Sequence, residues 1–243
     1  MSSDRYAIDD VAFIGRTVEE YEHMFDLDLS AWEGQSVLDC PGGACAFVAE
    51  ANTRDIDAVG VDILYDVPPD ELHEKCESDV DTAIAGFEGV EDQFIWEFYD
   101  DVADVRAHWT AAYQEFIADY ADRFDTDRYV DAQLPDLPFE DDSFSLVLSA
   151  NLMFLYMEKF DYEFHEQSLL ELARVASDEV RVYPSNASTA SATRDWTNSA
   201  RCWPTRGTRR NFGRSRSGSS TGPRNSSESR SESHRPTLSA RGR

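Results

Sequence analysis

Residues 36–62 constrain the fold of this chain more than any other segment. An apolar strand pattern ends at Asp39, and the turn residues Gly42 and Gly43 follow. A helical stretch then leads to a second strand pattern, which ends at Asp62. Glycines let a backbone approach a ligand without an intervening Cβ, and N–H groups at a helix start can hold polar or anionic groups. An acid that closes the second strand of a βαβ unit can accept hydrogen bonds from ribose hydroxyls. The segment therefore predicts a site for a nucleoside-containing cofactor.

Strand and helix patterns alternate along the chain up to residue 184. Thr17 and Glu20 have the spacing of a capping box, which predicts a helix that starts after Thr17. Alternating strands and helices predict a parallel sheet covered on both faces, with ligands at the carboxyl ends of its strands. The predicted strands are 36–39, 58–63, 128–132, 145–150 and 179–183, and further helices are predicted at 44–52 and 165–175.

The connection between the second and third predicted strands is several times longer than a simple crossover requires. Residues 69–125 have helical patterns throughout and predict a helical insert. This insert contains ten aromatic residues. We expect most of them to form a helix–helix core, whereas some can line a lid over a substrate.

The charge of the chain changes sign at residue 184. Residues 1–184 contain 10 Lys and Arg against 45 Asp and Glu, whereas residues 185–243 contain 12 Arg against 3 acids. The acids of the first part are spread along the sequence. This spread favours adaptation to molar salt, where screening removes self-repulsion, over a local acidic patch for a basic partner. Because such a chain repels phosphates, we expect no nucleic-acid partner.

The cysteines and the polarity of the chain indicate a cellular compartment. No CxxC pair or histidine cluster accompanies the four cysteines, so we expect neither a metal site nor redox chemistry. No run of about 18 apolar residues predicts a membrane span, and residues 1–10 have no signal-peptide pattern. We therefore expect a cytoplasmic protein without a membrane partner.

Residues 185–243 differ from the rest of the chain in composition. They contain no Val, Ile or Met and a single Leu, and they are rich in Ser and Arg. Such a segment buries too little apolar surface to offset its ordering entropy, so it is predicted to be a disordered tail. Three origins are open: a basic tail for nucleic acid or membrane surfaces, a flexible linker, or a shifted reading frame. The reversal of charge favours the shifted frame.

Four segments of the sequence follow one another in a recognisable order. An acid and glycines occur at 39–43, Asp62 closes the second strand, Asp131 and Ala132 follow the third, and residues 139–147 lead into the fourth. From about residue 33 to residue 184, this series resembles class I S-adenosylmethionine-dependent methyltransferases, and residues 139–147 are its most specific part. The resemblance implies a Rossmann-like domain at 1–184 with a mostly parallel sheet.

The resemblance also implies cofactor-binding positions at the ends of the strands. The acid and glycines of the first motif would face the methionine and ribose parts of S-adenosylmethionine. The acid after the second strand would bind the ribose hydroxyls, the pair after the third would border the adenine, and a residue after the fourth would border the methyl donor. These positions are Asp39, Gly42, Gly43, Asp62, Asp131, Ala132 and Asn151.

The sequence departs from the family pattern in three places. Of the three glycines usual at alternate positions of the first motif, only Gly43 is present, between Pro41 and Cys45. Ser145 stands where the family commonly has Asp. The family sheet continues with a sixth and a seventh strand, and residues 185–243 contain no apolar pattern that could supply them.

The resemblance implies methyl transfer from S-adenosylmethionine to a small-molecule acceptor. Tyr156, Tyr162 and His165 are the candidates for a general base, although none is singled out by the sequence. The altered glycines and missing strands leave open a non-catalytic or inactive cofactor-binding module. Asp62 would also suit a nicotinamide-dependent oxidoreductase, but the G-x-G-x-x-G pattern of that class is absent.

Overall fold

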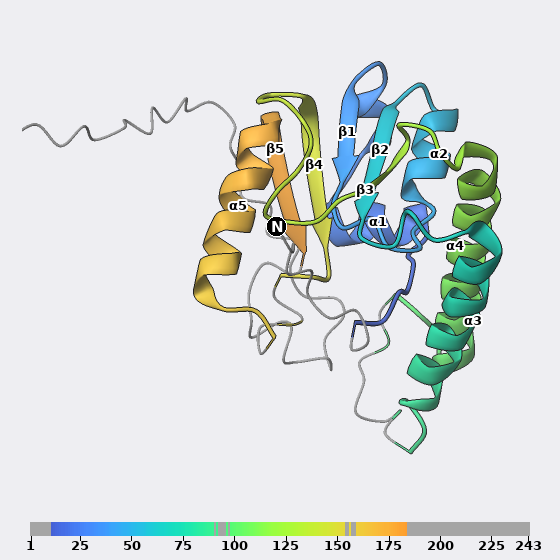
Figure 1. Ribbon diagram of the computed structural model, residues 1–243. Helices are drawn as coiled ribbons and strands as arrows, with labels where there is room; N and C mark the ends of the chain where they lie inside the picture. The colour runs from blue at the N-terminus through green and yellow to red at the C-terminus, as the bar shows by residue number, and fades with distance from the viewer. Residues whose placement is uncertain are drawn as a thin grey trace, which may run out of the picture. The chain divides into compact units, whose positions relative to one another are not determined.

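The computed structural model describes residues 11–89, 91, 96, 98–153, 156 and 159–183 of this chain (Figure 1). Within these residues, five strands form one sheet in the order β3-β2-β1-β4-β5, and every neighbouring pair is parallel. The predicted Rossmann-like α/β class is therefore confirmed. The predicted tail at 185–243 lies outside the described residues.

The elements follow the predicted order, with ends that differ from the sequence prediction by a few residues. The strands are β1 (Ser36–Asp39), β2 (Asp57–Asp62), β3 (Tyr129–Asp131), β4 (Phe144–Ala150) and β5 (Ala176–Tyr183). The helices are α1 (Val18–Phe25), the 3₁₀ helix η2 (Leu29–Trp32), α2 (Phe47–Thr53), α3 (Pro69–Ala85), α4 (Val102–Arg123) and α5 (Tyr162–Val175).

Side-chain caps fix where several helices begin. At α1, Thr17 Oγ1 accepts from the Glu20 N–H at 3.3 Å, and Glu20 Oε2 accepts from the Thr17 N–H at 2.8 Å. This is the predicted capping box, and it satisfies two backbone donors that the helix leaves unpaired. Asp101 caps α4 and Asp161 caps α5 in the same way, each through a side-chain oxygen that accepts a backbone N–H.

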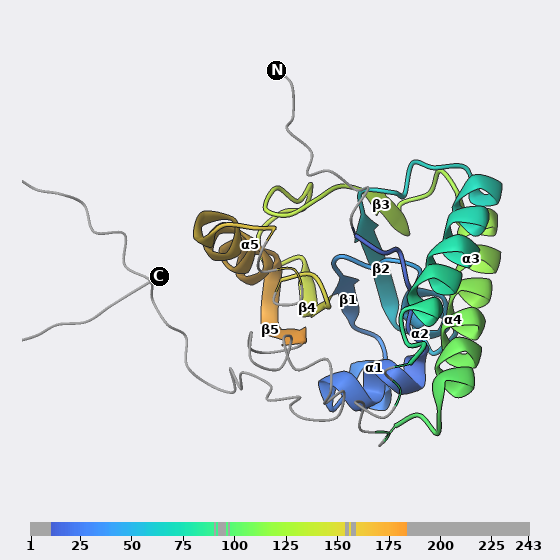
Figure 2. The ribbon, with the colours of Figure 1, turned by 90° about the horizontal axis from the view of Figure 1, so that it is seen from below.

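The two faces of the sheet carry different helices. Figure 2 shows α2, α3 and α4 on one side of the sheet and α5 on the other. The long crossover from β2 to β3 consists of the paired helices α3 and α4, as the pattern of residues 69–125 predicted. Their aromatic side chains pack mainly into the core beside the sheet, including Trp109, Tyr113, Phe116 and Tyr120.

The buried residues form two clusters, one on each face of the sheet. The cluster beneath α1, α2, α3 and α4 is rich in aromatic rings, with Tyr21, Phe47 and Phe116 fully buried. The cluster beneath α5 is mainly aliphatic, with Val147, Leu172 and Val175 fully buried. Burial on both faces explains why the central strands have nearly continuous apolar sequences.

The order of the strands determines where a ligand can bind. The chain leaves β1 toward β2 on one side and later returns to β4 on the other side of β1. A crevice forms outside the carboxyl ends of the strands where the direction of winding reverses. In this sheet, that point lies between β1 and β4.

Candidate functional site

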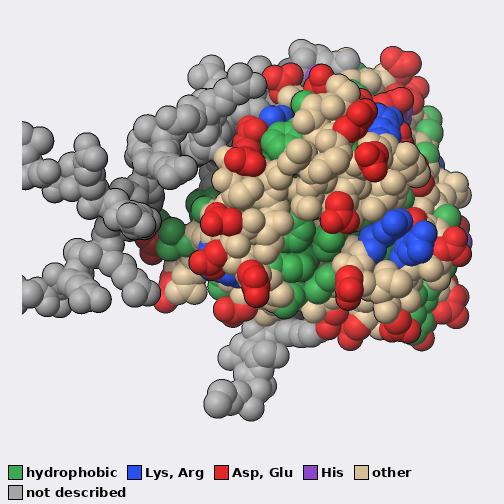
Figure 3. Space-filling view, turned by 90° about the horizontal axis from the view of Figure 1, so that it is seen from above, with side chains coloured by type: hydrophobic (Ala, Val, Ile, Leu, Met, Phe, Trp, Pro, Cys, Tyr) green, Lys and Arg blue, Asp and Glu red, His purple; other side chains and the backbone are tan. Residues whose placement is uncertain are grey.

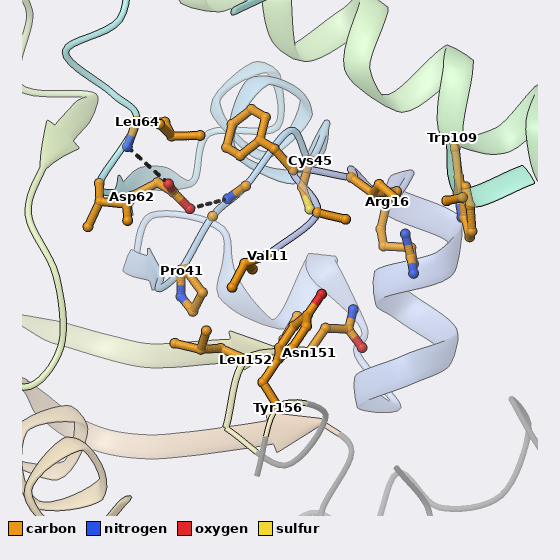
Figure 4. A pocket seen from close by; sticks show the side chains of 18 residues that line it. Val11, Arg16, Pro41, Cys45, Asp62, Leu64, Trp109, Asn151, Leu152 and Tyr156 are labelled. Carbon is orange, nitrogen blue, oxygen red and sulfur yellow. Dashed lines mark hydrogen bonds between the residues drawn. The ribbon is translucent and has the colours of Figure 1, made fainter. Parts of the chain in front are cut away.

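A cavity of about 290 Å³ lies at the reversal point between β1 and β4 (Figure 4). Its walls come from residues 11–16, which we call the N-terminal strap, from the glycine turn at 41–45, from the end of β2, and from the chain after β4. Ala83 of α3 and Trp109 of α4 complete the wall. The cavity therefore joins the start of the described chain to the ends of three strands and to the helical insert.

Asp62, the last residue of β2, is held in place by the backbone around the cavity. Its Oδ2 accepts from the Gly43 N–H at 3.2 Å, and its Oδ1 accepts from the Leu64 N–H at 3.1 Å (Figure 4). Burial raises the pKa of Asp62 to about 6, and the N–H donors oppose that rise. The side chain is thus mainly ionised at neutral pH. Each carboxylate oxygen has a second lone pair with which it can accept a ligand hydroxyl.

Gly42 and Gly43 are required in the turn for different structural reasons. Gly43 has a φ of +54°, which L-residues with a side chain rarely adopt. A Cβ on Gly42 would lie 2.4 Å from the Tyr65 hydroxyl oxygen. That hydroxyl donates to the Gly43 carbonyl oxygen at 2.8 Å. Gly42 therefore makes room for Tyr65, whose hydrogen bond fixes the turn.

The backbone donors of this turn are already used within the protein. The Gly42 N–H donates to Val61 O at 2.8 Å, Gly43 donates to Asp62, and the Ala46 N–H donates to Arg16 O at 3.0 Å. The expectation that donors at the helix start hold a ligand is therefore wrong for these three groups. Helix α2 begins only at Phe47, and no side chain caps it.

Asp39 lies behind the cavity and is not part of its wall. The carboxyl group is fully buried and accepts the Tyr21 hydroxyl, at 2.9 Å to Oδ2 and 3.1 Å to Oδ1. Burial raises its pKa to about 8, against the effect of the Tyr21 hydrogen bond, and the charge of Asp62 adds to the rise. Asp39 thus has a direct link to α1 and an electrostatic link to Asp62.

The remaining predicted positions divide into two groups. Asn151 lies in the cavity wall with a φ of +58°, and its N–H donates to Tyr183 O at 2.7 Å. Asp131 is paired in register with Asp62 on the neighbouring strand, and Ala132 follows it. Neither Asp131 nor Ala132 belongs to the wall of this cavity. The structure therefore gathers Gly42, Gly43, Asp62 and Asn151 at one cavity.

The three candidates for a general base lie in different surroundings. Tyr156 belongs to the cavity wall, and burial raises the pKa of its hydroxyl, which makes proton loss harder. Tyr162 is 79% exposed on α5. The His165 ring nitrogens lie 2.6 Å from Met153 O and 2.6 Å from Asp161 O, so the ring connects the start of α5 to the chain after β4. Only Tyr156 of the three lines the cavity.

The N-terminal strap was not among the site residues predicted from the sequence. A Cβ on Gly15 would lie 1.8 Å from Ala44 O, so the strap crosses the glycine turn at very close range. The Phe13 N–H donates to Asp79 Oδ2 of α3 at 2.7 Å, which ties the strap to the insert. Gly15 was the available signal, but a single glycine does not reveal which segment it must approach.

Arg16 is the second wall residue that the sequence did not reveal. Its side chain is 7% exposed, and its guanidinium lies 4.8 Å from the centre of the Trp109 ring. Nε lies 3.3 Å from Glu20 Oε1, and Nη1 donates to Gly15 O at 2.8 Å. The strap, α1 and α4 therefore hold this cation together at the cavity.

No known family model matches the sequence. The chain is 30% identical over 176 residues to the uncharacterized protein MJ0045 of Methanocaldococcus jannaschii, a match that covers 72% of this chain and 78% of that protein. The chain belongs to the family of MJ0045.

A solved structure from Methanococcus maripaludis, provisionally assigned as an S-adenosyl-L-methionine-dependent methyltransferase, is also similar. The identity is 12% and the TM-score is 0.37, with 75% of this chain and 66% of that chain covered.

Among the helices that the structure describes, none is long and apolar enough to cross a membrane. Within the same residues, no group of three or more His, Cys, Asp and Glu side chains is arranged to hold a metal ion.

Proposed function

We propose that this protein binds S-adenosylmethionine in the cavity and transfers its methyl group to a small-molecule acceptor. The observation that carries this proposal is the Asp62 carboxylate, fixed by the N–H groups of Gly43 and Leu64 in the wall of a cavity at the reversal point of the sheet. A parallel sheet binds nucleotides at this point, and an acid at the end of the second strand suits ribose hydroxyls.

The wall residues fit the parts of this cofactor. Asp62 would accept the ribose hydroxyls, and the apolar side chains of Ile63 and Leu64 would pack against the nucleoside. Asn151, directly after β4, would lie toward the transferred group. Asp131 and Ala132 stay assigned to the adenine only by the resemblance, because they lie outside this wall.

The chain's contribution to the reaction would be orientation and exclusion of water. The cofactor supplies an electrophilic methyl group on a sulfonium, so the acceptor needs alignment more than activation. The strap and Trp109 line the cavity together with the strand ends, and they would help to shield a reacting pair from solvent. Tyr156 is available as a hydrogen-bond donor to the acceptor rather than as a base, since burial raises its pKa.

The surface charge supports a small-molecule acceptor. The formal net charge is −26, and Figure 3 shows acidic side chains spread over the face seen from above, with few basic ones between them. Such a surface repels nucleic-acid phosphates. The same spread of acids supports the proposal that the protein works at molar salt, where that repulsion is screened.

Ligand titration in molar KCl tests the proposed function. Thermal-shift measurements and calorimetry should show binding of S-adenosylmethionine and S-adenosylhomocysteine, and no binding of NAD⁺ or NADH. Binding of NAD(H) alone would replace the proposal with a nicotinamide-dependent oxidoreductase, because Asp62 suits both cofactors. If none of the four ligands binds, both the methyltransferase and the oxidoreductase proposals are contradicted.

Catalysis needs a separate measurement from binding. The protein, incubated with radiolabelled S-adenosylmethionine and a pool of small metabolites, should release S-adenosylhomocysteine and label a small molecule. Tight cofactor binding without label transfer to any pool would support the non-catalytic module instead.

A further inference from the structure

The cavity carries charges of opposite sign in different parts of its wall. Asp62 is the acidic residue and Arg16 the basic residue of the described wall. Figure 4 shows the two side chains on opposite sides of the cavity, with Cys45 and Val11 between them. A ligand that fills this space therefore meets an anion at one end and a cation at the other.

Arg16 is held rigidly before any ligand arrives. The Trp109 ring supports one face of the guanidinium at 4.8 Å, and Gly15 O accepts from Nη1 at 2.8 Å. Preset side chains lose little conformational entropy on binding, which raises the affinity that their hydrogen bonds provide. Burial of a charge is costly unless the charge is paired and hydrogen-bonded.

Glu20, which is not a wall residue, balances the charge of Arg16. It approaches Nε at 3.3 Å, and it also accepts the Thr17 N–H and the Tyr99 hydroxyl. These other donors share the negative charge of Glu20. A guanidinium has five N–H donors in a planar fork, so one group can hold Glu20, Gly15 and a ligand at once.

We propose that Arg16 binds the carboxylate of the amino-acid end of the cofactor, opposite the ribose site at Asp62. A carboxylate matches the planar fork of an arginine and forms charge-assisted hydrogen bonds with it. In a chain with a net charge of −26, a buried arginine in a ligand cavity is a local exception that favours an anionic group. This inference rests on the proposed function and adds a specificity-determining residue to it.

The inference predicts that the protein distinguishes nucleosides by their amino-acid end. S-adenosylhomocysteine has both the ribose and the carboxylate, whereas 5′-methylthioadenosine has the ribose and lacks the amino-acid end. The native protein should bind S-adenosylhomocysteine about 10–100-fold more tightly, the usual effect of one hydrogen-bonded ion pair. Arg16→Met should lose most of this preference, because its side chain has similar length and no charge.

The experiment measures both dissociation constants by calorimetry on the full chain in the same molar-KCl buffer. Arg16→Met should weaken S-adenosylhomocysteine binding about 10–100-fold and change methylthioadenosine binding less than about twofold. Arg16→Lys should recover part of the preference. Arg181→Met is the matched control, since Arg181 donates to Phe25 O and Asp26 O and is not a wall residue.

Each remaining outcome has a definite meaning. If Arg16→Met keeps the native preference for S-adenosylhomocysteine, or weakens the binding of both nucleosides equally, Arg16 has only a structural role and the inference is wrong. If the native protein binds both nucleosides equally well, the inference fails while the proposed cofactor site stands. If the native protein binds neither, the proposed function itself fails.

Discussion

The two faces of the sheet differ in the composition of their buried side chains and in how those side chains contact the site. The face beneath α1–α4 contains buried tyrosines whose hydroxyls reach polar groups at or behind the cavity: Tyr21 donates to Asp39, Tyr65 to Gly43 O and Tyr99 to Glu20. The face beneath α5 is mainly aliphatic. A buried tyrosine provides packing area and also needs a partner for its hydroxyl. The aromatic face therefore couples stability to several polar groups of the site, whereas the aliphatic face reaches the cavity wall only at its edge, through Leu152 and Tyr156.

The α5 face also explains the most specific motif of the sequence. The Arg174 guanidinium donates to Phe139 O and to Asp141, and the Asp142 N–H donates to Arg174 O. These contacts attach residues 139–142 to α5 at the start of β4, while the cavity lies at the opposite end of that strand. In this chain the motif anchors a loop, and it does not contact the proposed cofactor site.

The largest expected effect compares one core substitution on each face. Phe116→Ala should destabilise the protein by about 3–5 kcal/mol, and Leu172→Ala by about 2–5 kcal/mol. Phe116 stacks on Tyr65 with ring centres 5.7 Å apart, so its loss should also weaken nucleoside binding by the folded protein. Leu172→Ala should leave binding unchanged. Denaturant titrations give the stabilities, and calorimetry under folding conditions gives the affinities. Equal nucleoside binding by the two variants would contradict the proposed difference between the two faces.

The next effect concerns Asp62 and its neighbour in register. Asp62→Asn should weaken nucleoside binding by about 2 kcal/mol, because the variant loses the charge that strengthens hydrogen bonds from hydroxyls. Native affinity should likewise fall as the pH falls through about 6, where Asp62 becomes protonated. Asp131→Asn is the control, and it should have the smaller effect. An equal loss would show that the nucleoside extends to the end of β3, as the resemblance implies.

A third effect concerns the pH dependence of stability. Asp39 has a pKa of about 8 in the folded protein, against an ordinary value of 3.8. The folded state therefore binds this proton more tightly, and stability should fall as the pH rises from about 4 to 8, by up to about 1.4 kcal/mol per pH unit. Asp39→Asn should flatten this slope, because it keeps an acceptor for Tyr21 and cannot ionise. Denaturant titrations at several pH values provide the measurement. If Asp39→Asn leaves the dependence of stability on pH unchanged, Asp39 is not its cause.

The smallest effect isolates one hydroxyl of the aromatic face. Tyr65→Phe keeps the ring and removes the donor to Gly43 O, so it should cost about 1 kcal/mol of stability. Nucleoside binding should weaken slightly, since the glycine turn is held less firmly. Tyr129→Phe is a useful comparison, because the Tyr129 hydroxyl donates to Asp119 and not to the turn. A larger effect on binding for Tyr129→Phe would place the important hydroxyl elsewhere.

Local sequence patterns were sufficient for most of the fold. Apolar runs identified the strands to within a few residues, and the Thr17 capping box identified the start of α1. Such signals depend on neighbours within one turn or one strand, so the order of residues contains them. The pairing of the Gly43 turn with Asp62 was also predictable in outline, because consecutive parallel strands place their carboxyl ends together.

The contributions of the N-terminal strap and of α4 to the cavity wall could not be predicted in this way. Gly15 meets Ala44, and Arg16 meets Trp109, across separations in sequence that no periodic pattern spans. The sequence also could not reveal that the N–H groups of the glycine turn are already hydrogen-bonded, because their acceptors include Arg16 O and Val61 O from distant segments. These features depend on which segments pack together, and only the folded chain determines that.

By itself, the sequence determined an alternating α/β fold, an acid at the end of β2 and a glycine turn beside it, because these follow from local periodicity and backbone sterics. The tertiary structure decided which of the predicted residues share a cavity, that Gly42 makes room for Tyr65, and that a cation faces Asp62 from the N-terminal strap. The physical reason is that close packing brings together side chains that the chain itself keeps far apart, and burial then sets their charges and hydrogen bonds.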